Sequence, residues 1–272
     1  METAAMDSRT FRGICDLIYE KSGIRITEKK EALVLNRMGK RMRALGMEKH
    51  RDYLEMVRRD DNVEELNNLL DVVSTNVTHF FRESKHFEFL GQTATQWMSS
   101  GRRKLRFWCA ASSSGEEPYS IAFTLCEASA GFDCDIRILA TDICRRVLEQ
   151  GKAGVYPKKK VGDVPAKMRS TYFTARTQGG ETEYEVRPEV KRMVRFARLN
   201  LSEPPFPMAG PFDMIFIRNV MIYFDNEMRS RVLREAYRLL APGGFLIVGH
   251  AESLAGLLNS DFKKVHTSIY TR

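Results

Sequence analysis

The sequence predicts an α/β fold, a mostly parallel, doubly wound β-sheet with a small antiparallel β insertion, preceded by a small all-α domain. Three observations support this prediction. Through the first 75 residues, apolar residues recur at spacings of three and four, as in amphipathic helices. From residue 105 onward, short β-rich runs alternate with helical ones, which specifies a parallel sheet with helices on both faces. Between residues 156 and 190 this alternation is interrupted by two short β-type runs.

Four helical segments make up the N-terminal region, and they cover residues 11–23, 28–46, 49–60 and 63–74. In the second segment, at about 100° per residue, one face gathers apolar side chains: Val34, Leu35, Met38, Met42 and Leu45. The opposite face carries four basic ones: Arg37, Lys40, Arg41 and Arg43. This basic face is either a solvated surface or a docking surface for an acidic helix or a polyanion.

In the α/β region, strand-like runs cover residues 105–110, 136–142, 194–201, 212–219 and 244–250. Helical runs lie at 118–129, 143–151 and 227–240, and a short β-type run ends the chain at 265–272. Ligands of such folds bind at the carboxyl ends of the strands, where we expect the functional residues. We assign residues 1–75 to the helical domain, 76–104 to a linker segment and 105–272 to the α/β domain, with the β subdomain at about 165–190.

Composition limits the possible classes of protein. The chain has 272 residues, enough for a large core, and a formal net charge of +8, which indicates an anionic partner without identifying it. No apolar run approaches the roughly 20 residues of a membrane-spanning helix, and no secretory signal is visible. The five cysteines are scattered without paired spacing, which argues against a disulfide framework and a structural zinc. We therefore expect a cytoplasmic protein without a metal.

The turn after the first predicted strand combines small residues at 111–115 with two acids, Glu116 and Glu117. In dinucleotide-binding folds a pyrophosphate approaches the backbone here, and paired carboxylates would repel it. They favour instead a ligand with an ammonium or sulfonium group, such as the methionine part of S-adenosylmethionine. The alternative is that both glutamates are first-turn acids that the helix dipole stabilises.

Asp142 ends the second predicted strand. In folds of this type an acid at this position accepts hydrogen bonds from the two ribose hydroxyls of a nucleoside. It can equally serve as the N-cap of the helix that follows.

Six stretches together resemble the CheR family of chemotaxis receptor methyltransferases: TNVTHFFRE (75–83), SSGEEPYS (113–120), LATDI (139–143), RLNL (198–201), FDMIFIRNVMIYFD (212–225) and LLAPGGFLIVGHAES (239–253). The similarity spans almost the whole chain. It implies the class I fold of S-adenosylmethionine-dependent methyltransferases and transfer of a methyl group to glutamate carboxylates of chemoreceptors, with S-adenosylhomocysteine as the product. The sequence departs from the family's usual residues at His79, Ser112 and Ser114.

The resemblance also implies roles for individual residues. Cofactor contacts are expected at Asn76, Thr78, Arg82, Glu117, Asp142, Asn200, Leu201, Asn219 and Val220, with Glu117 at the methionine amino group and Asp142 at the ribose. Arg82, Arg218 and Tyr223 are expected beside the departing methyl group and are the predicted catalytic residues. The basic face would dock on the glutamate-rich cytoplasmic helical bundle of a receptor. Whether the β insertion captures a receptor tether is left open.

Two other functions remain as alternatives. The excess of basic residues, with three lysines at 158–160, is compatible with an RNA or DNA methyltransferase, although the fourth strand lacks the Asn/Asp-Pro-Pro-aromatic motif of enzymes that methylate exocyclic amines. A module that binds S-adenosylmethionine without transferring its methyl group is the other alternative. We expect no nucleic acid partner, no membrane insertion and a monomer.

Overall fold

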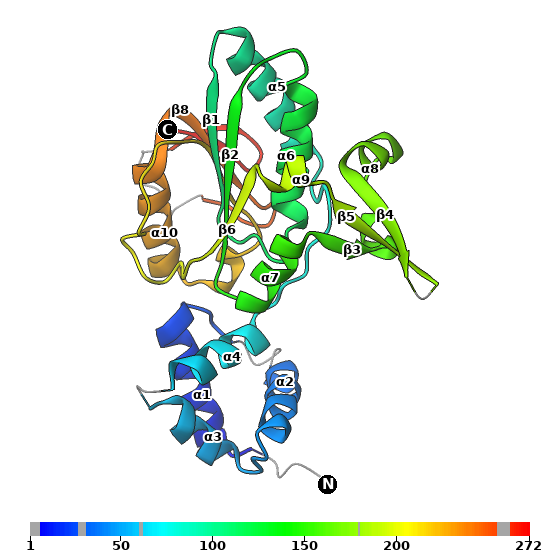
Figure 1. The fold of residues 1–272 in the computed structure, drawn as a ribbon. Coiled ribbons are helices and arrows are strands. Elements are labelled where there is room, and N and C mark those ends of the chain that lie inside the picture. The colour runs from blue at the N-terminus through cyan, green and yellow to red at the C-terminus, as the bar shows by residue number, and fades with distance from the viewer. Residues whose placement is uncertain (1–5, 27–30, 60–61, 179, 255–261) are drawn as a thin grey trace.

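The computed structural model describes residues 6–26, 31–59, 62–178, 180–254 and 262–272. A helical domain lies against one end of an α/β domain, and a small β subdomain projects from the side of the latter (Figure 1). Predicted helical residues 28–30 and 60, and Gly179 of the insertion turn, lie outside the described residues. No helix in the described part is both long enough and apolar enough to cross a membrane.

The helical domain contains α1 (Ser8–Ser22), α2 (Glu31–Ala44), α3 (His50–Val57) and α4 (Val63–Val73). Helix α1 begins where the Asp7 carboxylate accepts the amides of Arg9 and Thr10 at 3.0 and 2.9 Å, and it ends at Gly23, whose φ of 68° suits glycine. The core of the domain includes Ile14, Ile18, Met38, Met42, Tyr53 and Leu69.

The predicted apolar face of the second helix is confirmed for Val34, Met38 and Met42, which are buried. Leu35 is half-buried. The prediction is wrong for Leu45, which is 38% exposed. The reason is that α2 ends at Ala44, so Leu45 lies in the following turn and leaves the helix face.

The predicted basic face divides into two pairs of residues. Arg37 donates to the carbonyls of Val72 and Ser74 at 3.1 and 2.9 Å. Arg41 forms a two-pronged ion pair with the buried Glu65, which also accepts the Tyr53 hydroxyl at 2.8 Å. These two arginines therefore tie α2 to α4 inside the domain.

Lys40 and Arg43 are the exposed pair. The expectation of a four-residue docking face is corrected to these two side chains, because periodicity could place all four residues on one face but could not reveal the acceptors on α4.

Residues 85–99 were expected to be linker, and that expectation is wrong: they form helix α5 (Lys85–Ser99). Its apolar face packs on α6 (Glu116–Ala128) and belongs to the core of the α/β domain through Phe87, Leu90 and Met98. The connecting segment between the domains is thus confined to residues 74–84, which lie between α4 and α5.

The main sheet has the strand order β6-β2-β1-β7-β8-β10-β9. Its strands are β1 (Lys104–Cys109), β2 (Asp135–Asp142), β6 (Val194–Arg198), β7 (Phe212–Ile217), β8 (Leu240–Val248), β9 (Lys263–His266) and β10 (Ile269–Thr271). The first five of these are parallel, which confirms the predicted doubly wound sheet. The C-terminal run forms an antiparallel hairpin, β9–β10, on the edge next to β8.

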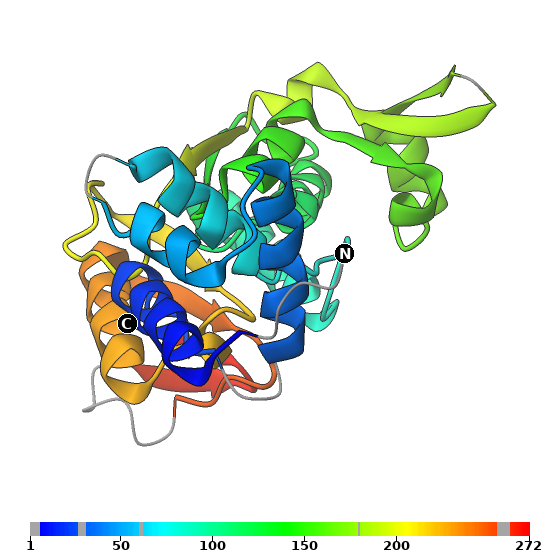
Figure 2. The same ribbon diagram turned by 90° about the horizontal axis from the view of Figure 1, so that it is seen from below.

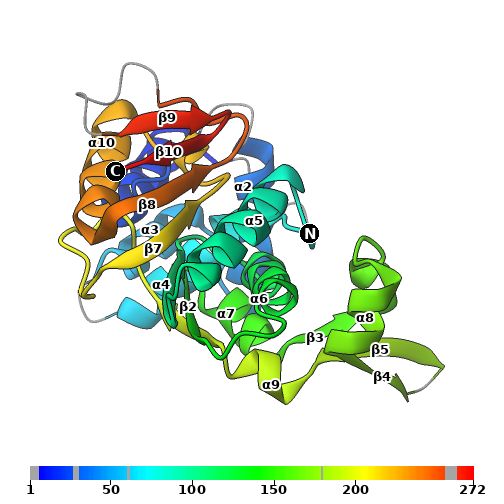
Figure 3. The same cartoon turned by 90° about the horizontal axis from the view of Figure 1, so that it is seen from above.

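Helices cover both faces of the sheet. Helices α5 and α6 lie on one side and α10 (Asn226–Leu239) on the other (Figure 3). Each face has its own core, one centred on Phe107 and Phe123 and the other on Trp108 and Val232. Helix α7 (Arg145–Ala153) follows β2, and α9 (Pro188–Lys191) precedes β6.

The β subdomain consists of β3 (Val155–Pro157), the 3₁₀ turn η2 (Lys158–Val161), α8 (Ala166–Tyr172), β4 (Phe173–Gln178) and β5 (Glu181–Val186). Its three strands are antiparallel in the order β3-β5-β4, and they project away from the main sheet (Figure 2). The predicted antiparallel insertion is confirmed, but its boundary at about 165 is corrected to 155, because the sequence pattern gave no signal for the three-residue strand β3.

Arg41→Met should lower the free energy of unfolding of the helical domain by about 3 kcal/mol, because the buried Glu65 would lose its cationic partner. Hydrogen exchange of the α2 and α4 amides in the full chain measures this. Arg43→Met removes the same charge from an exposed position and should change stability by less than about 0.5 kcal/mol. Equal protection in both variants would contradict the structural role of Arg41.

Candidate cofactor-binding and catalytic site

A pocket lies at the carboxyl ends of four parallel strands, β1, β2, β6 and β7. Strand order reverses beside β1, the position where open α/β sheets bind ligands. Ser22 at the end of α1, Ile24 just after it, and the connecting segment Ser74–Thr78 close the pocket from the helical domain. All of the predicted cofactor and catalytic residues line this one pocket: Asn76, Thr78, Arg82, Glu117, Asp142, Asn200, Leu201, Arg218, Asn219, Val220 and Tyr223.

The turn between β1 and α6 is made of small residues because other parts of the chain lie close to it. Gly115 has a φ of 98°, and a Cβ atom there would lie 2.6 Å from the Tyr156 hydroxyl and 2.9 Å from Gly151 Cα. Ser113 adopts a φ of 47°, which turns its amide toward Asp142. The turn must therefore be tight, because the β subdomain and α7 both approach it.

Asp142 is buried at the end of β2 and accepts two amides, that of Ser113 at 2.9 Å and that of Cys144 at 3.0 Å. Burial raises the pKa of Asp142, and the two amides partly oppose this rise. Each carboxylate oxygen keeps a further lone pair for a hydroxyl group. The N-cap alternative is not what the structure has, because Asp71 of α4 accepts the first amides of α7, those of Arg145 and Arg146, at 3.1 and 3.4 Å.

Glu117, in the first turn of α6, forms an ion pair with Arg218 at the end of β7. Its other oxygen accepts the Cys109 thiol at 3.1 Å. Glu117 therefore presents a fixed carboxylate to the pocket, with lone pairs remaining for an ammonium group.

The Arg218 side chain is fully buried. It contacts Glu83 at 3.1 Å as well as Glu117, and it donates to the carbonyl of Arg82. The expected role of Arg218 beside the departing methyl group stays a prediction. Its guanidinium lines the pocket and is paired with two carboxylates, Glu117 and Glu83, which it holds in place.

The loop after β7 is held by a residue that the sequence analysis did not single out. Glu252 is buried and accepts the amides of Asn219, Met221 and Gly249 at 2.7, 2.8 and 2.7 Å. Asn219 has a φ of 57°. Glu252 thus stabilises the strained backbone that turns Asn219 and Val220 toward the pocket. Glu252 is visible in the sequence as part of the stretch GHAES, but which amides it accepts depends on the fold.

Two contacts fasten the helical domain to the pocket. The Asn200 amide donates to the Lys21 carbonyl and to Glu203, both at 2.7 Å. The Tyr223 carbonyl accepts the Arg25 amide at 2.9 Å. Asn200 and Tyr223 are therefore pocket residues that also anchor the end of α1, with Leu201 buried beside them.

Arg82 is the second arginine of the pocket, and it is half-buried. One of its nitrogens donates to the Val77 carbonyl at 3.2 Å. Its guanidinium thus differs from that of Arg218, which is enclosed between carboxylates. His79, at the same segment, is exposed and lies 3.7 Å from Asp163 of the β subdomain.

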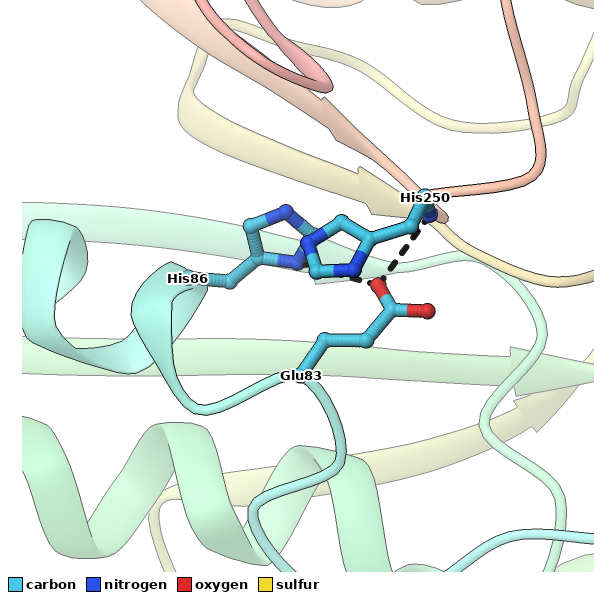
Figure 4. A group of neighbouring side chains, drawn as sticks. All are labelled: Glu83, His86 and His250. Carbon is cyan, nitrogen blue, oxygen red and sulfur yellow. Dashed lines mark hydrogen bonds and ion pairs between the residues drawn. The ribbon is translucent and has the colours of Figure 1, made fainter.

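A second group of residues was missed from the sequence: Glu83, His86 and His250, here called the Glu–His–His cluster (Figure 4). Glu83 lies 3.4 Å from His86 Nδ1 and accepts the His250 amide at 3.3 Å. Burial is the largest effect on His86, and its pKa is lowered to about 4. Nothing in the spacing of these residues indicated that they would meet, because His250 follows β8, whereas Glu83 precedes α5 and His86 lies in its first turn.

The fold and the pocket define an S-adenosylmethionine-binding methyltransferase. Residues 76–271 match the family model described as "CheR methyltransferase, SAM binding domain", and residues 9–74 match "CheR methyltransferase, all-alpha domain". The chain belongs to the CheR methyltransferase family.

Relatives of the chain cover most of its length. It is 38% identical to the chemotaxis protein methyltransferase of Salmonella typhimurium, over 93% of this chain and 87% of that one. It is 37% identical to chemotaxis protein methyltransferase 2 of Pseudomonas aeruginosa, over 89% of this chain and 86% of that one. The chemotaxis protein methyltransferase of Escherichia coli is 37% identical, over 94% and 88% respectively.

Asp142→Asn should weaken binding of S-adenosylhomocysteine by about 10- to 100-fold, because an amide offers fewer acceptors to the ribose and a charged acceptor contributes about 1.5–3 kcal/mol. Isothermal titration calorimetry measures the dissociation constant. Asp133→Asn changes an exposed acid before β2 and should leave the affinity unchanged. Equal affinity in the two variants would contradict the assignment of Asp142.

Proposed function

We propose that this protein transfers the methyl group of S-adenosylmethionine to glutamate side-chain carboxylates of chemoreceptors, forming methyl esters. One observation supports a carboxylate substrate in particular. Among the described residues that line the pocket, none is a histidine, lysine or cysteine. Its two carboxylates are both engaged, Glu117 by Arg218 and Asp142 by backbone amides.

This composition suits a nucleophile that needs no base. A glutamate carboxylate has an ordinary pKa near 4.3 and is ionised at neutral pH, so the chain need not accept a proton from it. An amine or hydroxyl nucleophile would have to lose a proton during methylation. The pocket therefore favours a carboxylate over the exocyclic amines of nucleic acid bases.

The donor set fits S-adenosylmethionine. The lone pairs left on Glu117 match the methionine ammonium, and those on Asp142 match the two ribose hydroxyls. When bound, the cofactor supplies an electrophilic methyl group on a sulfonium.

The residues of the chain orient the reactants. We assign Arg82 to the incoming glutamate, because its guanidinium is half-buried and lines the pocket while Arg218 is enclosed. Tyr223, from the 3₁₀ turn η3 (Met221–Tyr223), lines the same pocket and can orient a carboxylate oxygen. Holding that oxygen in line and excluding water accounts for catalysis without a proton transfer.

The exposed pair Lys40 and Arg43 supports docking of an acidic receptor helix on α2. Electrostatic attraction of this kind raises the association rate and sets the register of the partner. The three lysines at 158–160 give only weak support for a nucleic acid partner, because Lys160 is paired with the buried Glu116.

The proposed reaction is tested with methyl-labelled S-adenosylmethionine and receptor-bearing membranes. Carboxyl methyl esters release volatile methanol in alkali, whereas methylated amines and bases do not. We expect volatile label, reduced about 100-fold or more in Arg82→Gln and Tyr223→Phe, because each variant loses a hydrogen-bond donor to the reacting carboxylate.

The matched control is Tyr237→Phe in α10, outside the pocket, which should retain activity. Label that stays on protein or nucleic acid after alkali would contradict the substrate assignment. Full activity of Tyr223→Phe and Arg82→Gln would contradict their roles.

Reversing the charges of Lys40 and Arg43 to glutamate should raise the KM for receptor about tenfold, because two attractive surface contacts become repulsive. The affinity for S-adenosylhomocysteine should not change, since neither residue lines the pocket. The double variant Lys104→Glu/Lys263→Glu, at exposed positions of β1 and β9, changes the net charge by the same amount and controls for it. An unchanged KM in the double variant would exclude α2 as the docking surface.

A further inference from the structure

The Glu–His–His cluster lies outside the cofactor pocket, on the other side of Arg218 from Glu117. Its three potential ligand atoms lie within 4.8 Å of one another. The side chains of His86 and His250 face the Glu83 carboxylate (Figure 4), and the two imidazole rings are 5.0 Å apart. His86 and His250 line an open hollow together with His266 and Glu88.

His86 is the unusual member of this cluster. It is 1% exposed, and among the described residues neither of its ring nitrogens has a hydrogen-bond partner. Leaving a buried polar group without a hydrogen-bond partner is unfavourable. A buried imidazole with free nitrogens next to a carboxylate and a second imidazole has the chemistry of a metal ligand.

We propose that Glu83, His86 and His250 form a binding site for a divalent transition metal ion, with Zn²⁺ as the best match, and that its occupancy is coupled to the cofactor pocket. Two imidazoles and one carboxylate are a common zinc ligand set with an open fourth position. Ligand spacing along the chain gave no sign of a metal site and led us to expect no metal, whereas the fold brings these three residues together.

The spacing requires little rearrangement. A tetrahedral ion with bonds of about 2.1 Å holds its ligand atoms about 3.4 Å apart. Glu83 and His86 Nδ1 already have this separation, 3.4 Å. His250 is exposed, its ligand atom lies within 4.8 Å of the other two, and Glu88 and His266 line the same hollow.

The charges around the cluster permit a cation. Arg218 and the exposed Lys85 are the positive groups that face it, and Glu83 and Glu88 are the negative ones. The Arg218 guanidinium keeps its second carboxylate, Glu117, when Glu83 turns to a metal. The site is therefore compatible with a bound ion only if Arg218 shifts toward Glu117.

This shift of Arg218 couples metal binding at the cluster to cofactor binding in the pocket. Glu117 would be held more tightly by Arg218 and would be less available to the methionine ammonium, so the metal should weaken cofactor binding. By linkage, the cofactor should weaken metal binding by the same factor.

The test uses the full chain, freed of metal with a chelator and titrated with Co²⁺, whose visible absorption reports tetrahedral coordination. We expect one equivalent with nitrogen and oxygen ligands, no thiolate-to-metal band, and displacement by Zn²⁺. His250→Ala should weaken binding at least about tenfold, since even outer partners of metal ligands contribute this much. His50→Ala, in the helical domain, removes an imidazole elsewhere and should leave binding unchanged.

Titration of S-adenosylhomocysteine into the same samples tests the coupling, and we expect Zn²⁺ to weaken its binding several-fold in the wild type but not in His250→Ala. Unchanged affinity in zinc-loaded wild type would overturn the coupling. Absence of saturable binding, a thiolate-to-metal band, or full affinity in His250→Ala would overturn the site. None of these readouts depends on receptor methylation, so failure of the metal site and failure of the proposed function are distinguishable.

Discussion

The buried guanidinium of Arg218 joins three segments that are far apart in the sequence. It binds Glu117 at the start of α6, Glu83 before α5 and the carbonyl of Arg82, and it lies at the end of β7. Removing one partner of such a buried charge network typically costs about 3–5 kcal/mol, because the remaining charges stay buried and unpaired. The position of Glu117, the carboxylate that we propose as the partner of the methionine ammonium, therefore depends on this one side chain.

The rest of the pocket is built from backbone held in uncommon conformations. Four non-glycine residues with positive φ lie at or beside it: Phe81, Glu83, Ser113 and Asn219. Such strain persists only where the surroundings determine it, and here Asp142 and Glu252 accept the amides of Ser113 and Asn219. The helical domain also helps to build the pocket, since Asp71 accepts the first amides of α7. The helical domain therefore contributes to the pocket and also carries the proposed docking surface.

Local sequence patterns predicted the parallel strands, their carboxyl ends and most of the helices, because burial of a parallel strand and of a helix face leaves a periodic signal. They did not predict α5 or α8. The resemblance to a family predicted the pocket residues, and all of them line one pocket. The patterns failed where a side chain's partner is distant in sequence. Arg37 and Arg41 bind acceptors at α4. Arg218 is paired with two carboxylates that lie far from it in the sequence. His86 contacts His250, which follows it by more than 160 residues. Periodicity reports which face a residue occupies but not which group it contacts.

The stability of Arg218→Met tests the central claim most directly. Both tryptophans, Trp97 and Trp108, belong to the α/β domain, so urea unfolding followed by tryptophan fluorescence reports on this domain alone. If Arg218 holds Glu117 and Glu83 in place, the variant should lose about 3–5 kcal/mol of unfolding free energy. Wild-type stability combined with lost methyl transfer would contradict this account and would return Arg218 to a direct catalytic role.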